Sequence, residues 1–290
     1  MSSVRDDDPD GVGGDGPRDK RLGVIGGIAW GAVAYLAMTI ATGILLVLRP
    51  GRANDLVGFT LCSALAFSAC TYGIARLYLP TRTVGDALGA RAVSPIAYVL
   101  GALVGVALLV PATWLDDAVV AKFPYSEEER AFIEQAFTFS SLGHKIAFAV
   151  AAIAIGPAFE DLLFRGALYR AVRRTAPAHL AIVASSVAFA FAHSNNVRAL
   201  PYVLVGGLVL GCLREASGSV WVSLAAHVGY NAVPVLAQLG SWLPATADPA
   251  NLSPKVVVVG SVATLALVGL VVLLGRRSET MRAARAEDER

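Results

Sequence analysis

The sequence predicts an all-α polytopic membrane protein with about eight transmembrane helices and both termini in the cytoplasm. Its residues are 56% hydrophobic and only 16% charged, and the mean hydropathy is +0.61. A spanning helix needs about 20 apolar residues, and lipid favours helices because backbone groups there must be hydrogen-bonded internally. Four segments reach this length without a charged side chain: Leu22–Leu48, Leu56–Ala75, Ala92–Leu115 and Val256–Gly275.

Four further apolar segments suit spanning helices but are interrupted by polar side chains. They cover residues 144–172, 179–197, 199–214 and 217–240. Together with the four uninterrupted segments they give eight helices, and an even number places both termini on the same side.

Composition divides the chain into six consecutive parts. The first 20 residues are rich in Asp, Gly and Pro and lack an apolar core, which is typical of a disordered tail and not of a signal peptide. The charged C-terminal segment is expected to fray into water. We expect a disordered cytoplasmic tail over 1–21, three transmembrane helices over 22–115, an external loop over 116–143, a helical core over 144–240, a loop and last transmembrane helix over 241–275, and a cytoplasmic tail over 276–290.

The distribution of basic residues predicts the orientation in the cell membrane, because cytoplasmic loops carry an excess of Lys and Arg. With the N-terminus inside, the predicted outer loop at 116–143 carries six acidic residues. The predicted inner regions then hold most of the arginines: Arg18, Arg21, Arg76, Arg82, Arg91, Arg170, Arg173, Arg174, Arg214, Arg276 and Arg277. Both termini are therefore expected in the cytoplasm.

The predicted outer loop contains a helix start of its own. Ser126 is followed three residues later by Glu129, the spacing of a capping box. Phe132, Ile133 and Phe137 follow at helical spacing, so we expect an amphipathic helix lying at the outer interface. The simpler interpretation is that this helix caps the bundle, and the alternative is that it gates substrate entry.

Charge and cysteine content exclude several partners. The net charge is only +2, so no nucleic-acid partner is expected, and the lipid bilayer is the expected surroundings. The three cysteines, Cys62, Cys70 and Cys212, all fall inside predicted spans. They suit small apolar packing residues better than disulfide partners or a metal cluster.

Three polar clusters lie inside the apolar segments of the second half of the chain. The first contains Glu160, Asp161 and Arg165, the second contains His193, and the third contains His227 and Asn231. An ionisable group near the centre of a membrane helix costs roughly 3 kcal/mol or more, so such groups are usually functional. The alternative is that they pair only to hold a helix bundle together.

Helical geometry brings these clusters to one level of the membrane. Glu160 and His193 are equally distant from the turn expected at Thr175–Ala178, about 20 Å at 1.5 Å per residue. His227 lies about ten residues beyond the next expected turn, at Glu215–Gly218. Polar side chains from three helices are therefore predicted to converge.

Spacing within the first cluster separates two roles. Asp161 and Arg165 are i and i+4 with the acid first, the favourable order for pairing on one helix face. Glu160 points about 100° away from Asp161, because an α-helix has 3.6 residues per turn. We therefore expect a structural Asp161–Arg165 pair and a Glu160 carboxylate that faces a cavity.

These residues resemble the motifs of the CPBP (Abi) family of CAAX prenyl endopeptidase-like intramembrane proteases. The family pattern EExxxR corresponds here to Glu160-Asp161-xxx-Arg165, FxxxH to Phe189-xxx-His193, and HxxxN to His227-xxx-Asn231. The resemblance covers about residues 144–240. One departure is Asp161, where the family usually has a second Glu.

The resemblance implies an endopeptidase that hydrolyses a peptide bond of a membrane-associated protein or peptide. In a metal-free version Glu160 is the general base, His193 orients the water, and His227 with Asn231 stabilises the oxyanion. In a metalloprotease version Glu160, His193 and His227 bind one zinc ion and leave a position open for water. The residues do not decide between these versions, so no cofactor is assigned.

Two other classes of function are open at this point. A catalytically silent membrane scaffold or regulator of the same fold is the main alternative, and a complete set of polar residues argues against it. A transporter is favoured less, because transporters commonly have repeat symmetry between their halves. Here the intramembrane charges all lie in the second half of the chain. The identity of the substrate is not encoded in these patterns.

Overall fold

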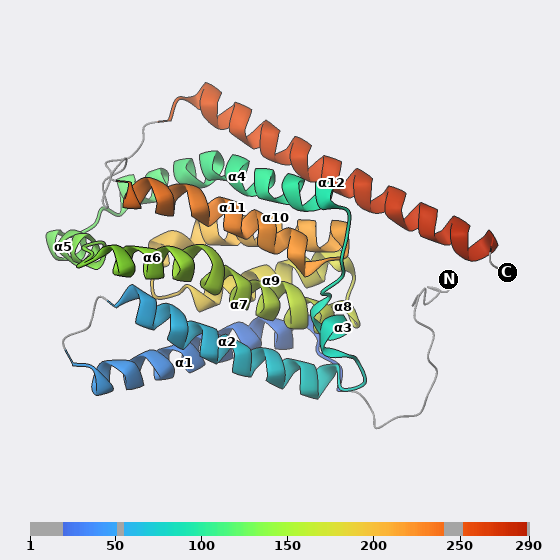
Figure 1. The fold of residues 1–290 in the computed structure, drawn as a ribbon, viewed down its shortest axis with the longest axis horizontal. Coiled ribbons are helices and arrows are strands. Elements are labelled where there is room, and N and C mark those ends of the chain that lie inside the picture. The colour runs from blue at the N-terminus through green and yellow to red at the C-terminus, as the bar shows by residue number, and fades with distance from the viewer. Residues whose placement is uncertain (1–19, 51–54, 241–251, 289–290) are drawn as a thin grey trace.

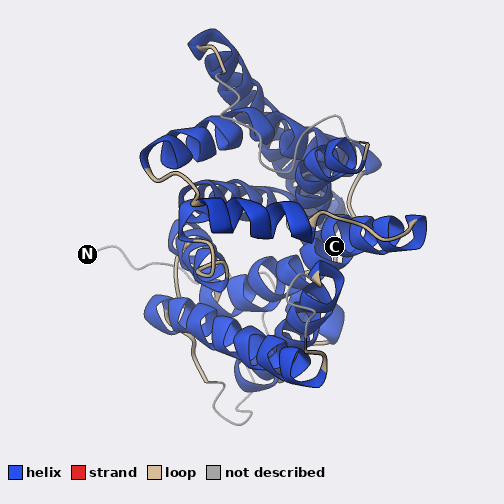
Figure 2. Cartoon of the chain, turned by 90° about the vertical axis from the view of Figure 1, so that its left-hand side faces the viewer, coloured by secondary structure: helices blue, strands red, loops and turns tan. Residues whose placement is uncertain are grey.

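The computed structural model describes residues 20–50, 55–240 and 252–288. Within these ranges every regular element is helical, and the long helices run side by side in a bundle (Figures 1 and 2). Residues 1–19 of the expected tail over 1–21 lie outside the described residues, as does most of the loop before the last helix. The all-α class predicted from the sequence is confirmed.

Three long helices form the first part of the chain. They are α1 (Val24–Leu48), α2 (Leu56–Tyr78) and α4 (Pro95–Lys122), with the short α3 (Val84–Leu88) between the last two. Helix α4 continues to Lys122, seven residues beyond the predicted end of the span. The predicted capping box is present, and it starts α5 (Glu127–Ala136) at one end of the bundle (Figure 1).

The fourth spanning unit is one continuous rod built from five helical segments. These are α6 (Leu142–Val150), the π-helix η1 (Ala151–Ile155), α7 (Gly156–Asp161), the π-helix η2 (Leu162–Leu168) and α8 (Tyr169–Arg173). Pro157 lies just after η1 and has no N–H to donate to the preceding turn. The wider turn of η1 precedes this proline, and π-turns inside helices occur frequently at functional sites.

Four further helices complete the described fold, apart from the 3₁₀ turn η3 (Val197–Ala199). They are α9 (Ala178–Ala192), α10 (Leu200–Ser217), α11 (Val220–Leu239) and α12 (Pro254–Asp288). The last helix continues to Asp288, so the predicted fraying after Arg276 is not observed. The Arg, Ala and Glu residues there are good helix formers, which accounts for this difference.

Seven helices of the described chain are long and apolar enough to cross a membrane. The eighth predicted span, 179–197, is instead α9, a helix of 15 residues. Fifteen residues cover only about 22 Å, less than the ~30 Å hydrocarbon core. The chain leaves the helix at His193, and non-helical backbone at this depth is tolerated where protein or a water-filled cavity surrounds it.

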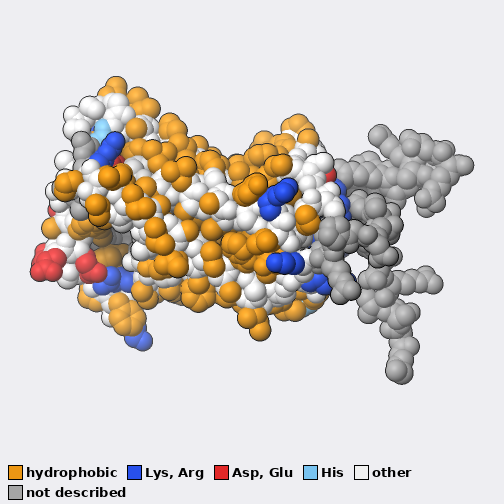
Figure 3. Space-filling model, turned by 90° about the horizontal axis from the view of Figure 1, so that it is seen from below, with side chains coloured by type: hydrophobic (Ala, Val, Ile, Leu, Met, Phe, Trp, Pro, Cys, Tyr) orange, Lys and Arg blue, Asp and Glu red, His pale blue; other side chains and the backbone are white. Residues whose placement is uncertain are grey.

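The surface of the bundle matches a lipid environment. Hydrophobic side chains form a broad band along its length, with Lys, Arg and acidic side chains gathered toward the two ends (Figure 3). Large apolar side chains such as Leu65 and Leu265 are each 71% exposed. The chain is therefore a multi-pass membrane protein, as a soluble protein rarely exposes so large an apolar surface.

Close contact between α4 and α11 depends on glycine. A Cβ atom on Gly105 would lie 1.8 Å from the carbonyl oxygen of Ala226, and one on Gly229 would lie 2.5 Å from that of Ala102. Small residues at such crossings let helix backbones approach within a membrane. This contact fixes α11, which carries His227, beside α4.

Candidate active site

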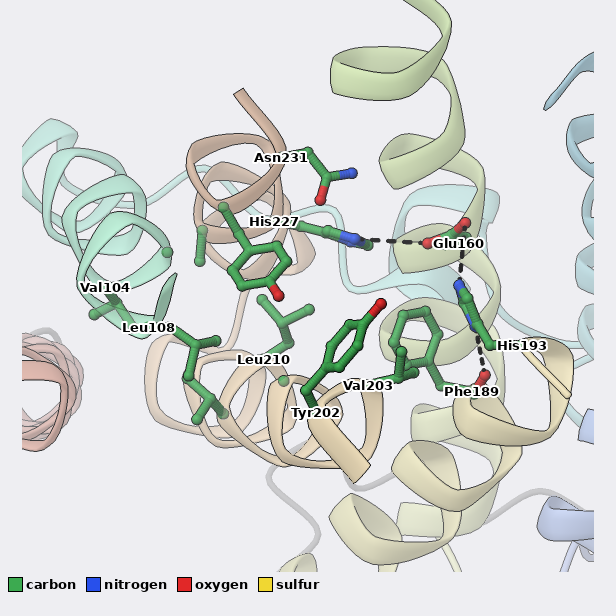
Figure 4. Close-up of a pocket in the computed structure, with 15 residues that line it drawn as sticks. Val104, Leu108, Glu160, Phe189, His193, Tyr202, Val203, Leu210, His227 and Asn231 are labelled. Atoms are coloured by element: carbon green, nitrogen blue, oxygen red, sulfur yellow. Dashed lines mark hydrogen bonds and ion pairs between the residues drawn. The ribbon is translucent and has the colours of Figure 1, made fainter. Parts of the chain in front are cut away.

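A cavity of about 230 Å³ lies among α4, α7, α9, α10 and α11. The side chains of Glu160, His193, His227 and Asn231 all line it (Figure 4). Residues from three predicted spans are thus brought together, as the depth argument predicted.

Glu160 lies between two histidines. Its Oε1 atom is 4.0 Å from His193 Nε2, and its Oε2 atom is 3.6 Å from His227 Nε2. These separations are longer than direct hydrogen bonds, and contacts beyond about 3.5 Å are commonly bridged by a water. The carboxylate is therefore placed to share a water with either ring.

His193 is held by its own helix. It is the C-cap residue of α9, and its Nδ1 atom is 2.9 Å from the carbonyl oxygen of Phe189. A carbonyl oxygen can only accept, so Nδ1 is the donor in this contact, and Nε2 is the ring nitrogen that faces Glu160. The Phe189 ring also packs against the His193 ring at a centroid distance of 4.6 Å. The FxxxH spacing thus orients His193 in two ways.

His227 is held by Asp161. Its Nδ1 atom is 2.9 Å from Asp161 Oδ2, and the Asp161 side chain is fully buried. Glu160 instead faces the cavity with its side chain 17% exposed. The predicted divergence of these adjacent carboxylates is therefore confirmed, but Asp161 has a second contact that spacing along one helix does not reveal.

Arg165 forms the predicted pair with Asp161, at 3.7 Å between Nε and Oδ1. The guanidinium is completely buried, and it lies over the Phe189 ring at 4.0 Å from the centroid. Such a cation–π contact partly compensates a charge removed from water. Arg165 therefore supports both the Asp161 carboxylate and the aromatic side chain that packs on His193.

One amide hydrogen of Asn231 forms a hydrogen bond within the protein. Its Nδ2 atom donates to the carbonyl oxygen of Ala152 in η1, at 2.9 Å. This bond joins α11 to the π-segment of the rod. A carboxamide has two N–H groups, so the other one is left for the oxyanion role predicted from the sequence.

Sequence reasoning missed two tyrosines that line the cavity, Tyr202 and Tyr230. Neither belongs to a motif at recognisable spacing, and only the packing of α10 and α11 reveals them. The hydroxyl end of Tyr202 points toward Glu160 and His227 (Figure 4). Tyr202 therefore adds a hydrogen-bond donor to the polar end of the cavity.

The donor types of a zinc site are present in Glu160, His193 and His227. Both histidines also have Nδ1 held by an oxygen acceptor, as in many metal-binding histidines. Across the described ranges, however, no group of three or more His, Cys, Asp or Glu side chains is arranged to hold a metal ion. Zinc binding by Glu160, His193 and His227 stays a prediction.

Part of the chain matches the model of a known protein family. Residues 142–233 match a family model described as Type II CAAX prenyl endopeptidase Rce1-like. This segment extends from α6 into α11 and includes Glu160, His193, His227 and Asn231. No curated protein and no solved structure matches the chain.

Proposed function

We propose that this chain, whose segment 142–233 matches the Type II CAAX prenyl endopeptidase Rce1-like family model, is an intramembrane endopeptidase. The observation that carries the proposal is the Glu160 carboxylate between the Nε2 atoms of His193 and His227. A carboxylate and two imidazoles at one cavity wall provide a base, an orienting acceptor and a hydrogen-bond donor. Its substrate is a membrane-associated protein or peptide.

The first chemical step is attack by water on the scissile carbonyl. Glu160 accepts the proton from a water that His193 Nε2 orients, and the water oxygen bonds to the carbonyl carbon. The carbonyl oxygen then carries the negative charge. Glu160 next delivers the accepted proton to the amide nitrogen, the carbon–nitrogen bond breaks, and two peptide products remain.

Stabilisation of the oxyanion is assigned to three side chains. Asp161 accepts a hydrogen bond from His227 Nδ1–H and so fixes the orientation of the ring. The Nε2–H of the imidazolium form of His227 is the first donor to the oxyanion. The second N–H of Asn231 and the hydroxyl of Tyr202 are the other donors. Donors fixed before the reaction stabilise developing charge without reorganisation.

In this version of the mechanism Glu160 is the base and no step passes through a metal. Metal analysis tests this version against the zinc version. A glutamate enzyme purified gently carries no stoichiometric metal and keeps its activity in chelators. About one equivalent of zinc, lost in His227→Ala, would instead support the metalloprotease version.

Peptidomics of intact membranes tests the proposed function. We expect membrane peptides that are cleaved in a strain with the wild-type chain to accumulate uncleaved in a strain with Glu160→Gln. Identical peptide profiles at equal protein levels would favour the scaffold or regulator alternative.

A further inference from the structure

One wall of the cavity is a single face of α10. Five of its residues line the cavity at spacings of three and four, so they share one side of the helix. Gly206 lies at the middle of this face. The five are Tyr202, Val203, Gly206, Val209 and Leu210.

Gly206 leaves open space where a side chain would be. A Cβ atom added there would have no heavy atom within 4 Å. The other two glycines of the helix interior differ, because a Cβ on Gly207 would lie 3.1 Å from Ser186 Cβ and one on Gly211 would lie 2.9 Å from Ile182 Cγ2. Those two glycines allow α10 to pack against α9, and Gly206 has no such packing role.

The space beside Gly206 is apolar and adjoins the reacting groups. Val104 and Leu108 of α4 lie on the opposite side of the cavity from Glu160 and His193 (Figure 4). A volume of about 230 Å³ is below the roughly 300–1,000 Å³ of pockets that enclose drug-sized ligands. It suits a peptide unit with one large side chain.

We infer that Gly206 is a specificity-determining residue, and that the space over it receives a bulky aliphatic or aromatic side chain of the substrate residue that flanks the scissile bond. The inference rests on the proposed endopeptidase function. Glycine at this position keeps the apolar part of the cavity open, whereas any larger residue would project into it. A substrate with a small residue there would leave apolar surface of the cavity unfilled.

Cleavage-site profiling of full-length variants in proteoliposomes tests this inference. The probe is a library of apolar membrane-inserting peptides in which one position varies among Gly, Ala, Val, Leu and Phe, and mass spectrometry identifies each cleaved bond. The wild type should prefer Leu and Phe beside the bond. Gly206→Leu should lower their kcat/KM by at least about 10-fold, the lower end of the effect of one methylene in an apolar pocket. Gly206→Ala should produce a smaller shift in the same direction.

Two glycines serve as controls. Gly43 of α1 also has open space around an added Cβ but lies outside the cavity, so Gly43→Leu should leave the profile unchanged. Gly207→Leu should lower the melting temperature, while Gly206→Leu should melt like the wild type.

The outcomes separate this inference from the function on which it rests. Glu160→Gln is expected to cleave no peptide of the library. A wild type that also cleaves none would overturn both the specificity role of Gly206 and the proposed endopeptidase function. A wild type that cleaves, with an unchanged profile in Gly206→Ala and Gly206→Leu, would overturn only the specificity role. If Gly206→Leu melted at a temperature as low as Gly207→Leu, the conclusion that open space lies beside Gly206 would be wrong.

Discussion

Arg165 is a completely buried charge whose three nitrogen atoms have no hydrogen-bond partner of good geometry among the described residues. Its compensation comes from the Asp161 carboxylate at 3.7 Å and the Phe189 ring at 4.0 Å. Removing one partner of a buried ion pair typically costs about 3–5 kcal/mol. The residue is therefore expected to act through stability and not through contact with substrate.

Arg165→Ala should accordingly lower the thermal stability of the purified protein in detergent, together with its activity. Arg173→Ala is a matched control, because Arg173 pairs with Glu215 while both side chains are more than a third exposed, and exposed pairs contribute about 0–1 kcal/mol. An Arg165→Ala protein that melts like the wild type yet is inactive would place Arg165 in the chemistry.

Tyr202 is expected to contribute to catalysis through its hydroxyl. Tyr202→Phe should reduce kcat by about 10²-fold with little change in KM, since loss of one oxyanion donor costs roughly 10²–10³ in rate. Tyr98→Phe removes a hydroxyl of α4 that accepts from the Val93 N–H and does not line the cavity, so its kcat should stay normal. Steady-state kinetics that show a normal kcat for Tyr202→Phe would remove it from the mechanism.

At this scale the sequence predicted which residues meet but not all of their contacts. Glu160, His193 and His227 could be placed at one depth because helix rise and turn positions are regular. The bond from His227 to Asp161 depends on how α7 packs against α11, and no spacing along the chain encodes it. The bond from Asn231 to Ala152 likewise needs the carbonyl geometry of η1.

Among the elements, α5 is joined to the segment that follows His193. Arg198 donates to both carboxylate oxygens of Glu129, at 2.8 and 3.1 Å, and also donates to the carbonyl oxygens of Phe123 and Pro124. A two-point contact between guanidinium and carboxylate fixes direction as well as distance. The α5 helix is thereby held over the turn between α9 and α10.

This contact should depend on pH in a defined direction. The hydrogen bond from Arg198 lowers the pKa of Glu129 below its ordinary value, so the stabilisation is present at neutral pH and is lost as pH falls through the lowered pKa. Spin labels at Gln135→Cys and Val205→Cys should keep their separation from pH 8 down to the ordinary glutamate pKa of about 4 and move apart only below it. A separation that changes between pH 8 and 6 would contradict this assignment.

Arg198→Ala also distinguishes the two roles considered for α5. It should separate the same labels at every pH, while Glu128→Ala should not, because Glu128 has no described bond to Arg198. If α5 only caps the bundle, cleavage rates should fall or stay constant. A higher rate in Arg198→Ala would support substrate gating.

The long helices were predictable in approximate position, but neither the number of spans nor the hydrogen-bond register was. Apolar composition indicates a span, yet it does not distinguish an α-turn from the π-turns of η1 and η2. The short length of α9 was not predicted either. The apolar segment of the sequence continues past Ala192, but the helix ends there. Both deviations occur beside the cavity, where local irregularity is expected in functional sites.

For the whole molecule, the central prediction is orientation. α1 begins and α12 ends at the same end of the bundle, with α5 at the other end (Figure 1). In a variant whose native cysteines are replaced, Glu128→Cys should react with an impermeant maleimide in intact cells. Arg282→Cys should react only after permeabilisation, because the positive-inside pattern predicts a cytoplasmic C-terminus. The reverse labelling would overturn this topology.

Activity of Glu160→Gln is the most direct test of the account as a whole. The substitution keeps the size and most hydrogen bonds of the side chain but removes its basicity, so the protein should fold and melt like the wild type. Purified into proteoliposomes with a peptide that the wild type cleaves, it should show no detectable hydrolysis. A folded Glu160→Gln variant that still cleaves this peptide would contradict the assignment of Glu160 as the base that activates water.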